Sequence, residues 1–199
     1  MKLLLTGSTG GIGRELLKFL KGYEITAVSS KDFTLPVVKR YDVDIVVHLA
    51  GMSLLNDLSE HSILNRKVID VNCLGTINLL ATYLPLMRHK GFGRVILMSS
   101  VCSEINLPLH GLYSATKAFN DKLVKIAALE NAQYGVTVNS IQLGYTGVGM
   151  SDRGSLEKQR NKPAMKRFCH MSELVNTIDY IVKTEYLTGQ NIRLDGGIR

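Results

Sequence analysis

The chain has 199 residues, a formal net charge of +7 and a hydrophobic content of 45%, which fits one domain with a sizeable core. Its three cysteines lack metal-ligand spacing, so we expect neither a metal site nor a disulfide framework. The basic charge comes without a helix-turn-helix, zinc or aromatic-basic motif, which argues against a nucleic-acid partner. No apolar run approaches the ~20 residues that cross a bilayer, and the one that opens the chain stops at Thr6, so we expect a cytoplasmic protein without a membrane partner.

The N-terminal segment predicts a cradle for a phosphate. An apolar strand, Lys2–Leu5, runs into a glycine-rich turn, and helical spacing follows from Glu15 to Leu20. This arrangement points backbone N–H groups and the positive end of a helix dipole at an anion, and glycine allows close approach of the backbone. An ordinary glycine-rich turn is the alternative. The candidate dinucleotide-binding residues here are Gly7, Ser8, Thr9, Gly11, Ile12 and Gly13.

Strand and helix patterns alternate along the rest of the chain. We expect strands at Ile25–Val28, Asp44–Val47, Arg94–Ser100 and Val136–Gln142. We expect one or two helices spanning Leu54–Lys90, a helix across Lys117–Gln133, and a late helix from Met171 capped by Ser172. Such alternation predicts the α/β class. The fold we expect is a Rossmann-like, doubly wound, mostly parallel sheet of six strands, or seven if a stub near Asp32 pairs, with helices on both faces and one domain over residues 1–199.

Tyr113 and Lys117 are the strongest candidates for catalysis. They are spaced i, i+4 and share one face of a helix. A nearby ammonium stabilises a phenolate and lowers the pKa of a tyrosine, which is the tuning that general acid–base catalysis requires. Ser100 stands at the carboxyl end of an apolar strand, where open α/β sheets build their sites. A solvated surface pair and a capping serine are the alternatives.

Taken together, these motifs resemble the short-chain dehydrogenase/reductase family along the whole chain. Thr6–Gly13 matches its Thr-Gly-x-x-x-Gly-x-Gly cofactor motif, and Ser100, Tyr113 and Lys117 match its catalytic residues in order and spacing. Asn72 matches the asparagine that completes the tetrad. The resemblance implies an NAD(P)(H)-dependent oxidoreductase that interconverts a carbonyl and a secondary alcohol by hydride transfer.

The resemblance also implies a role for each residue of the tetrad. Tyr113 would exchange a proton with the substrate oxygen, which Ser100 would also hydrogen-bond. Lys117 would favour the ionised form of Tyr113 and hold the nicotinamide ribose. Asn72 would anchor the water through which the lysine relays its proton, although an asparagine in an apolar helix often bonds backbone instead.

Several positions depart from the family pattern. Where Asn-Asn-Ala-Gly is common, the chain has His48-Leu49-Ala50-Gly51, which keeps Ala50 and Gly51 as cofactor contacts and makes His48 a candidate core histidine. Leu143-Gly144 replaces Pro-Gly beside the nicotinamide, and Thr146 is the candidate for the hydroxyl lost at Val148. The cofactor contacts expected here are Ala50, Gly51, Gly144 and Thr146, with Tyr113 and Lys117.

The interval between the second and third expected strands is too short for the usual pair of helices and a strand, since one βαβ unit takes roughly 30 residues. A unit is therefore trimmed, and Asp32 and Phe33 are candidates for the adenine contacts. The second strand ends in Ser29, Ser30 and Lys31, without the acid that would repel a 2′-phosphate. With Arg14 nearby, this favours NADP(H) over NAD(H). Asp32 is the argument for NAD(H), since the trimmed backbone could bring its carboxylate to the ribose.

Basic residues gather where the family has its substrate lid: Arg153, Lys158, Arg160, Lys162, Lys166 and Arg167. They favour an anionic small-molecule substrate, such as a phosphorylated sugar, a nucleotide sugar, a coenzyme A ester or an acyl group on an acidic carrier protein; a solvated lid is the alternative. Two other functions stay open, a nucleotide-sugar epimerase or dehydratase and a cofactor-binding interaction module without turnover.

Family members commonly pair through the helices that correspond to Leu54–Lys90 and Lys117–Gln133. We therefore expect a homodimer or homotetramer, with Leu79, Leu80 and Leu123 on the sides of these segments away from the sheet.

Overall fold

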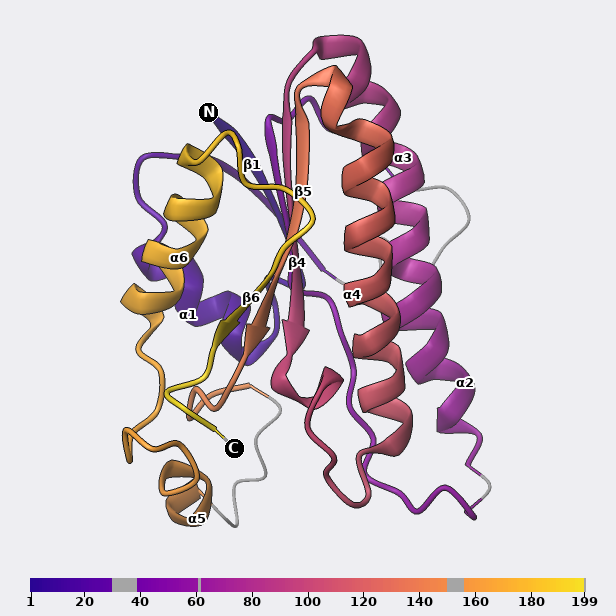
Figure 1. Cartoon of the computed structure of the whole chain (residues 1–199), viewed down its shortest axis with the longest axis vertical. Helices are drawn as coiled ribbons and strands as arrows, with labels where there is room; N and C mark the ends of the chain where they lie inside the picture. Colours follow the sequence, from indigo (N-terminus) through magenta and orange to yellow (C-terminus); the bar gives the residue numbers. More distant parts are fainter. Residues whose placement is uncertain (30–38, 61, 150–155, 199) are drawn as a thin grey trace.

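Six parallel strands form one sheet in the computed structural model, which describes residues 1–29, 39–60, 62–149 and 156–198 (Figure 1). The strands are β1 (Lys2–Thr6), β2 (Glu24–Val28), β3 (Ile45–His48), β4 (Gly93–Ser100), β5 (Val136–Leu143) and β6 (Asn191–Leu194). Their order is β2-β1-β3-β4-β5-β6, with every neighbouring pair parallel. The predicted sheet of six strands is confirmed, while the stub suggested near Asp32 lies outside the described residues.

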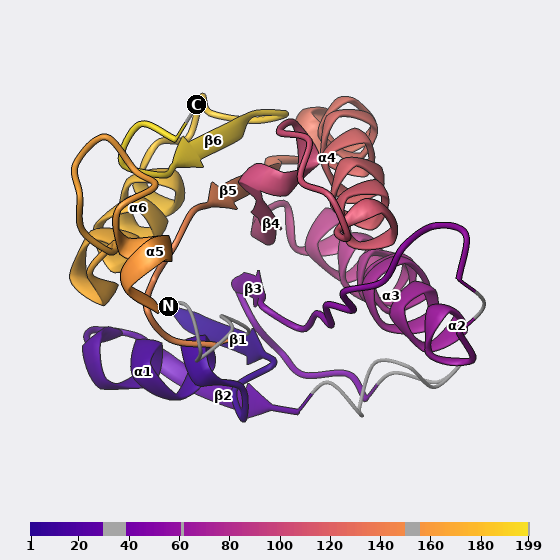
Figure 2. The same ribbon diagram turned by 90° about the horizontal axis from the view of Figure 1, so that it is seen from below.

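Helices cover both faces of the sheet. α1 (Gly11–Phe19) and α6 (Met171–Lys183) lie on one face, and α2 (Leu64–Ile69), α3 (Gly75–Lys90) and α4 (Gly111–Asn131) lie on the other (Figures 1 and 2). The short α5 (Leu156–Arg160) lies beyond the ends of the strands. This is the doubly wound arrangement that the sequence predicts.

The inner strands β1 and β3 are apolar on both sides because helices cover both faces of the sheet. Leu4 of β1 belongs to the core beneath α3 and α4, while its neighbours Leu3 and Leu5 belong to the core beneath α1 and α6. All three side chains are fully buried. Alternation along one strand thus serves two hydrophobic layers.

The helix over residues 64–90 begins ten residues later than the predicted segment. It includes a stretch of π-helix, η2 (Asp70–Leu74), between α2 and α3. The Asp57 carboxylate accepts bonds from the backbone N–H and the hydroxyl of Ser59, a local turn that competes with helix formation. The prediction of helix from Leu54 was therefore wrong at its start.

By length and composition, this helix of 27 residues is also apolar enough to cross a membrane, although 44% of its most apolar window is buried inside the fold. Leu79 and Tyr83 pack from it into the core under the sheet. Such packing is typical of a core helix of a globular domain.

Two further sequence predictions need correction. α6 is capped by His170, whose backbone N–H donates to Glu173 Oε2 at 2.8 Å, so Ser172 lies inside the helix and is not its cap. Leu79 and Leu80 are buried in the core and Leu123 packs against it, because the faces of α3 and α4 toward the sheet needed these apolar side chains. The large apolar side chains exposed on these two helices are Ile77, Leu86, Ile126 and Leu129.

The topology sets the place of the site. From β1 the chain moves outward to β2 and then returns across β1 to β3, so the direction of winding reverses between β1 and β3. Open α/β sheets bind ligands in the crevice at the carboxyl ends of the strands beside such a reversal. Figure 2 looks onto this edge of the sheet.

Candidate active site

The glycine turn after β1 is packed against the turn that follows β3. Gly7 has a left-handed backbone (φ +69°), and a Cβ there would lie 2.7 Å from the backbone nitrogen of Ala50. A Cβ on Gly11 would lie 2.5 Å from the backbone nitrogen of Gly149. Both positions therefore need glycine, because backbone atoms cannot move away as a flexible side chain can.

The start of α1 offers backbone donors to an anion. Gly10 is its N-cap and supplies no side-chain cap, and the first turn carries no acidic residue. Within the described residues the predicted cradle therefore fits the phosphates of a dinucleotide. Ser8 is buried and its hydroxyl donates to Val28 O at 2.9 Å, so that side chain joins β1 to β2, while Thr9 is exposed at the turn.

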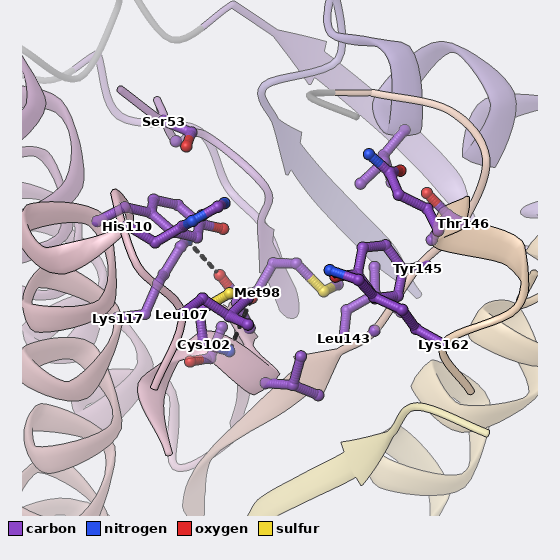
Figure 3. Close-up of a pocket in the computed structure, with 18 of the residues that line it drawn as sticks. Ser53, Met98, Cys102, Leu107, His110, Lys117, Leu143, Tyr145, Thr146 and Lys162 are labelled. Atoms are coloured by element: carbon purple, nitrogen blue, oxygen red, sulfur yellow. Dashed lines mark hydrogen bonds between the residues drawn. The ribbon is translucent and has the colours of Figure 1, made fainter. Parts of the chain in front are cut away.

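Three of the four predicted catalytic residues line one pocket of about 670 Å³ at the carboxyl edge of the sheet (Figure 3). Ser100 comes from the end of β4, and Tyr113 and Lys117 come from successive turns of α4. Besides Tyr113 and Lys117, four of the predicted cofactor contacts line the same pocket: Ile12, Gly51, Gly144 and Thr146.

Ser100 is placed by the turn that ends β4. Its Oγ accepts a bond from the backbone N–H of Cys102 at 3.2 Å and caps the 3-10 helix η3 (Val101–Ser103). The hydroxyl proton of Ser100 is then free to form a hydrogen bond with the Tyr113 oxygen. Burial raises the pKa of Tyr113 to about 12, and the Ser100 hydroxyl opposes this rise by favouring the phenolate.

Lys117 reaches across the end of the sheet from α4. Its Nζ donates to Met98 O at 2.8 Å and lies 5.7 Å from the centroid of the Tyr113 ring. Burial lowers the pKa of Lys117 to about 8. The pKa of Tyr113 is therefore raised and not lowered as its spacing from Lys117 predicted, because burial of the phenol is the largest cause.

Asn72 lies behind the pocket in the π-helical stretch and is fully buried. Its Oδ1 accepts from Met52 N at 2.7 Å, and its Nδ2 donates to Met52 O at 2.8 Å and to Thr116 Oγ1 at 2.9 Å. π-Helical turns often mark functional sites. The side chain ties the turn after β3 to α4, so the alternative of backbone bonding holds for it.

Gly51 joins these groups. A Cβ at this residue would lie 3.3 Å from Lys117 Nζ and 3.6 Å from Asn72 Oδ1. Its lack of a side chain keeps the space in front of the lysine open. Ala50, its neighbour, supplies the backbone against which Gly7 packs.

His48 is a core residue, as predicted. It is 2% exposed, and its Nδ1 is 2.7 Å from Thr6 Oγ1. Burial lowers the pKa of His48 to about 3, which keeps the imidazole neutral and removes it as a candidate acid.

The pocket also contains residues that the sequence analysis did not assign to it. His110, the N-cap residue of α4, lies three residues before Tyr113, and its Nδ1 is 3.0 Å from Pro108 O. Its i, i+3 spacing from Tyr113 was a usable signal. Tyr145 follows Gly144 and lies on the opposite wall from His110 (Figure 3). Thr146 uses its hydroxyl to donate to Val148 O at 2.8 Å.

The basic lid divides into two groups. Lys158 and Lys162 line the pocket, and Lys162 Nζ lies 3.1 Å from the Tyr145 hydroxyl. Lys166 instead donates to Asn161 O, and Arg167 pairs with Glu173 at 2.7 Å. Of the remaining predicted residues, Ser29 follows β2 directly, whereas Ser30, Lys31, Asp32, Phe33 and Arg153 lie outside the described part of the chain.

Known reductases resemble this chain in sequence. A family model described as enoyl-(acyl carrier protein) reductase matches residues 33–199. The 3-oxoacyl-[acyl-carrier-protein] reductase FabG of Staphylococcus aureus is 32% identical over 164 residues, which cover 78% of this chain. The chain spans 66% of the length of that relative.

Solved structures share the fold. ElxO with NADP bound superposes with a TM-score of 0.84 at 22% identity, covering 98% of this chain and 97% of the other. A 3-oxoacyl-[acyl-carrier protein] reductase with bound NAD from Brucella melitensis gives 0.84 at 22% identity, covering 99% and 90%. With the family model matching most of its length, the chain belongs to the short-chain dehydrogenase/reductase family, a family of NAD(P)-dependent oxidoreductases.

Proposed function

We propose that this protein is an NAD(P)(H)-dependent oxidoreductase that interconverts a carbonyl and a secondary alcohol. The observation that carries the proposal is one pocket lined by Ser100, Tyr113 and Lys117, with the glycine turn of a dinucleotide site at the same edge of the sheet. When bound, the nicotinamide supplies or accepts the hydride.

The protein's own residues handle the oxygen of the substrate. The Ser100 hydroxyl, whose oxygen already accepts from Cys102 N, donates to the carbonyl oxygen. Tyr113 gives that oxygen its proton during reduction and removes it during oxidation. Lys117 adds positive charge beside the phenol and holds the ribose of the cofactor. Asn72, whose side chain bonds the backbone of Met52, holds the turn after β3 against α4 behind the lysine.

Replacing the proton donor tests this proposal. Tyr113→Phe keeps the packing but removes the phenolic proton, so turnover should fall by at least 100-fold, the low end of the usual effect of general acid catalysis at about 10², while cofactor affinity changes within a few fold. Tyr145→Phe, another tyrosine of the same pocket, is the matched control and should keep most activity. More than a tenth of wild-type kcat in Tyr113→Phe would remove this residue from the chemistry.

For the coenzyme we propose NADP(H) over NAD(H). The proposal rests on the absence of an acidic residue in Ser29-Ser30-Lys31 and on Arg14, which is exposed in α1. NADPH should give a higher kcat/KM than NADH, and Arg14→Ala should weaken the binding of NADPH more than the binding of NADH. A net fall in NADPH absorbance also identifies a reductase. An epimerase regenerates its nicotinamide and a module without turnover leaves it unchanged, so neither gives such a fall.

For the substrate we propose an anionic carbonyl compound. An acyl thioester is favoured by the similarity of the chain to 3-oxoacyl-[acyl-carrier-protein] reductases. Lys158 and Lys162 line the pocket mouth, and Lys158→Gln with Lys162→Gln should raise KM with little loss of kcat, because binding lost equally in ground and transition states appears in KM. Arg160→Gln with Lys166→Gln removes the same charge from residues that do not line the pocket and serves as the control. Equal turnover of neutral ketones would count against an anionic substrate.

We also propose a cytoplasmic homodimer or homotetramer. Support comes from the apolar side chains that α3 and α4 leave exposed, above all Leu129, which is 83% exposed. Light scattering at micromolar concentration should give the mass of an oligomer, and a monomeric mass would contradict this.

A further inference from the structure

Asp121 is a buried carboxylate with no part in the proposed chemistry so far. It lies on α4 four residues after Lys117, and the two side chains are 6% and 4% exposed. Residues four apart are neighbours on one helix face. The carboxylate therefore lies one turn beyond the catalytic lysine, inside the protein.

Neutral groups hold Asp121 in place. Its Oδ1 accepts from Ser140 Oγ at 3.0 Å and its Oδ2 accepts from Gln142 Nε2 at 2.9 Å, both from β5. Among the described residues, no lysine or arginine pairs with it within 4.0 Å. A buried charge is costly unless another charge compensates it, and the buried cation on its own helix is Lys117.

The other groups that face Lys117 supply little negative charge. They are Met98 O from β4, the phenol of Tyr113, the thiols Cys73 from η2 and Cys102 from η3, and the neutral imidazole of His48 from β3. Burial raises the pKa of Cys73, which keeps it a thiol. Glu104 shares Gln142 Nε2 with Asp121 at 2.8 Å, but its side chain is 54% exposed, so water screens it.

We infer that Asp121 is a positioning residue that keeps Lys117 in its ammonium form through a buried charge-to-charge interaction, with Ser140 and Gln142 fixing the carboxylate. The inference rests on the proposed function for its effect on catalysis, but the interaction itself does not. Burial pushes Lys117 toward the neutral amine, and the carboxylate opposes that push.

Asp121→Asn removes the charge and keeps the size. The ionisation midpoint of Lys117 should fall by about one pH unit, at the low end of the effect of a nearby opposite charge. At pH 8 the charged fraction would then fall from about a half to about a tenth, so kcat/KM should drop about fivefold at pH 8 and stay nearly unchanged at pH 6. A merely structural role would lower activity equally at both values.

Ser140→Ala is the matched control, since it removes one hydrogen bond to Asp121 and leaves the charge. It should leave the pH profile within 0.3 unit of wild type, a tolerance of roughly a factor of two in the equilibrium. NMR titration of the Lys117 side chain, assigned by its loss in Lys117→Met, reads the ionisation without any substrate. This measurement separates failure of the inference from failure of the proposed function.

An unchanged Lys117 midpoint in folded Asp121→Asn overturns the inference. If that variant does not fold, the wild-type carboxyl resonance of Asp121 decides, because a carboxyl group that is protonated at pH 7 has no charge with which to stabilise the lysine. An ionised carboxylate whose protonation at lower pH perturbs the Lys117 resonance supports it.

Discussion

Replacing Gly7 with alanine tests the packing that shapes the cofactor turn. At φ +69°, a Cβ would lie 2.7 Å from Ala50 N and 2.9 Å from the backbone carbon of Leu49. The left-handed backbone costs an alanine about 1–2 kcal/mol, and overpacking against backbone adds about 1–3 kcal/mol. Gly7→Ala should therefore lower the free energy of unfolding by about 2–5 kcal/mol.

Gly91 provides the matched control. It has φ +70°, and a Cβ there would meet nothing within 4 Å. Gly91→Ala thus carries the backbone cost alone, so the difference between the two variants measures the packing of the turn. Urea unfolding without added cofactor gives both values, and a difference below 0.5 kcal/mol, smaller than the roughly 1 kcal/mol minimum of overpacking, would refute the close contact between the turns after β1 and β3.

Three further predictions concern charge and assembly. Lys117→Met should weaken nicotinamide binding and move the basic limb of the pH–rate profile upward, because the group whose pKa is about 8 is gone; unchanged affinity with an unchanged limb would contradict its role. His48 stays neutral in the fold down to a pKa of about 3, whereas an unfolded histidine is protonated below about 6.5, so wild-type stability should fall by up to about 4 kcal/mol from pH 6.5 to pH 3. His48→Asn should lack that slope in urea unfolding, and equal slopes would show that other groups cause it. Leu129→Glu should shift the mass measured by light scattering toward that of the monomer. An unchanged oligomer mass would exclude the exposed face of α4 as the oligomer interface.

The order of strands and helices was predictable because each apolar strand is short and bounded by glycine or polar residues. The start of the helix at Leu64 was not, since the Asp57 turn depends on a local side-chain bond that hydrophobic spacing does not reveal. The sides of α3 were also misjudged. Leu79 and Leu80 are adjacent in sequence, and only the packing of the helix on the sheet shows that both are buried.

That Ser100, Tyr113 and Lys117 meet in one pocket was predictable because the strand and the helix that carry them are regular. Residues brought in by loops, such as Tyr145, carry no such pattern. The behaviour of the site was harder still to predict, since a pKa depends on burial, and burial is a property of the folded molecule. The spacing of Tyr113 and Lys117 predicted a lowered pKa for the tyrosine. The fold buries both side chains, and burial raises the pKa of Tyr113 instead.

Burial favours the uncharged form of each member of this pair. It raises the pKa of Tyr113 to about 12 and lowers the pKa of Lys117 to about 8. Below about pH 8 the phenol therefore keeps its proton while the lysine is an ammonium, which is the state needed to protonate a carbonyl oxygen. Alcohol oxidation instead needs the phenolate, which burial disfavours, so we expect oxidation to require a higher pH than reduction. Through the interaction that we infer, Asp121 would extend to higher pH the range over which Lys117 is an ammonium.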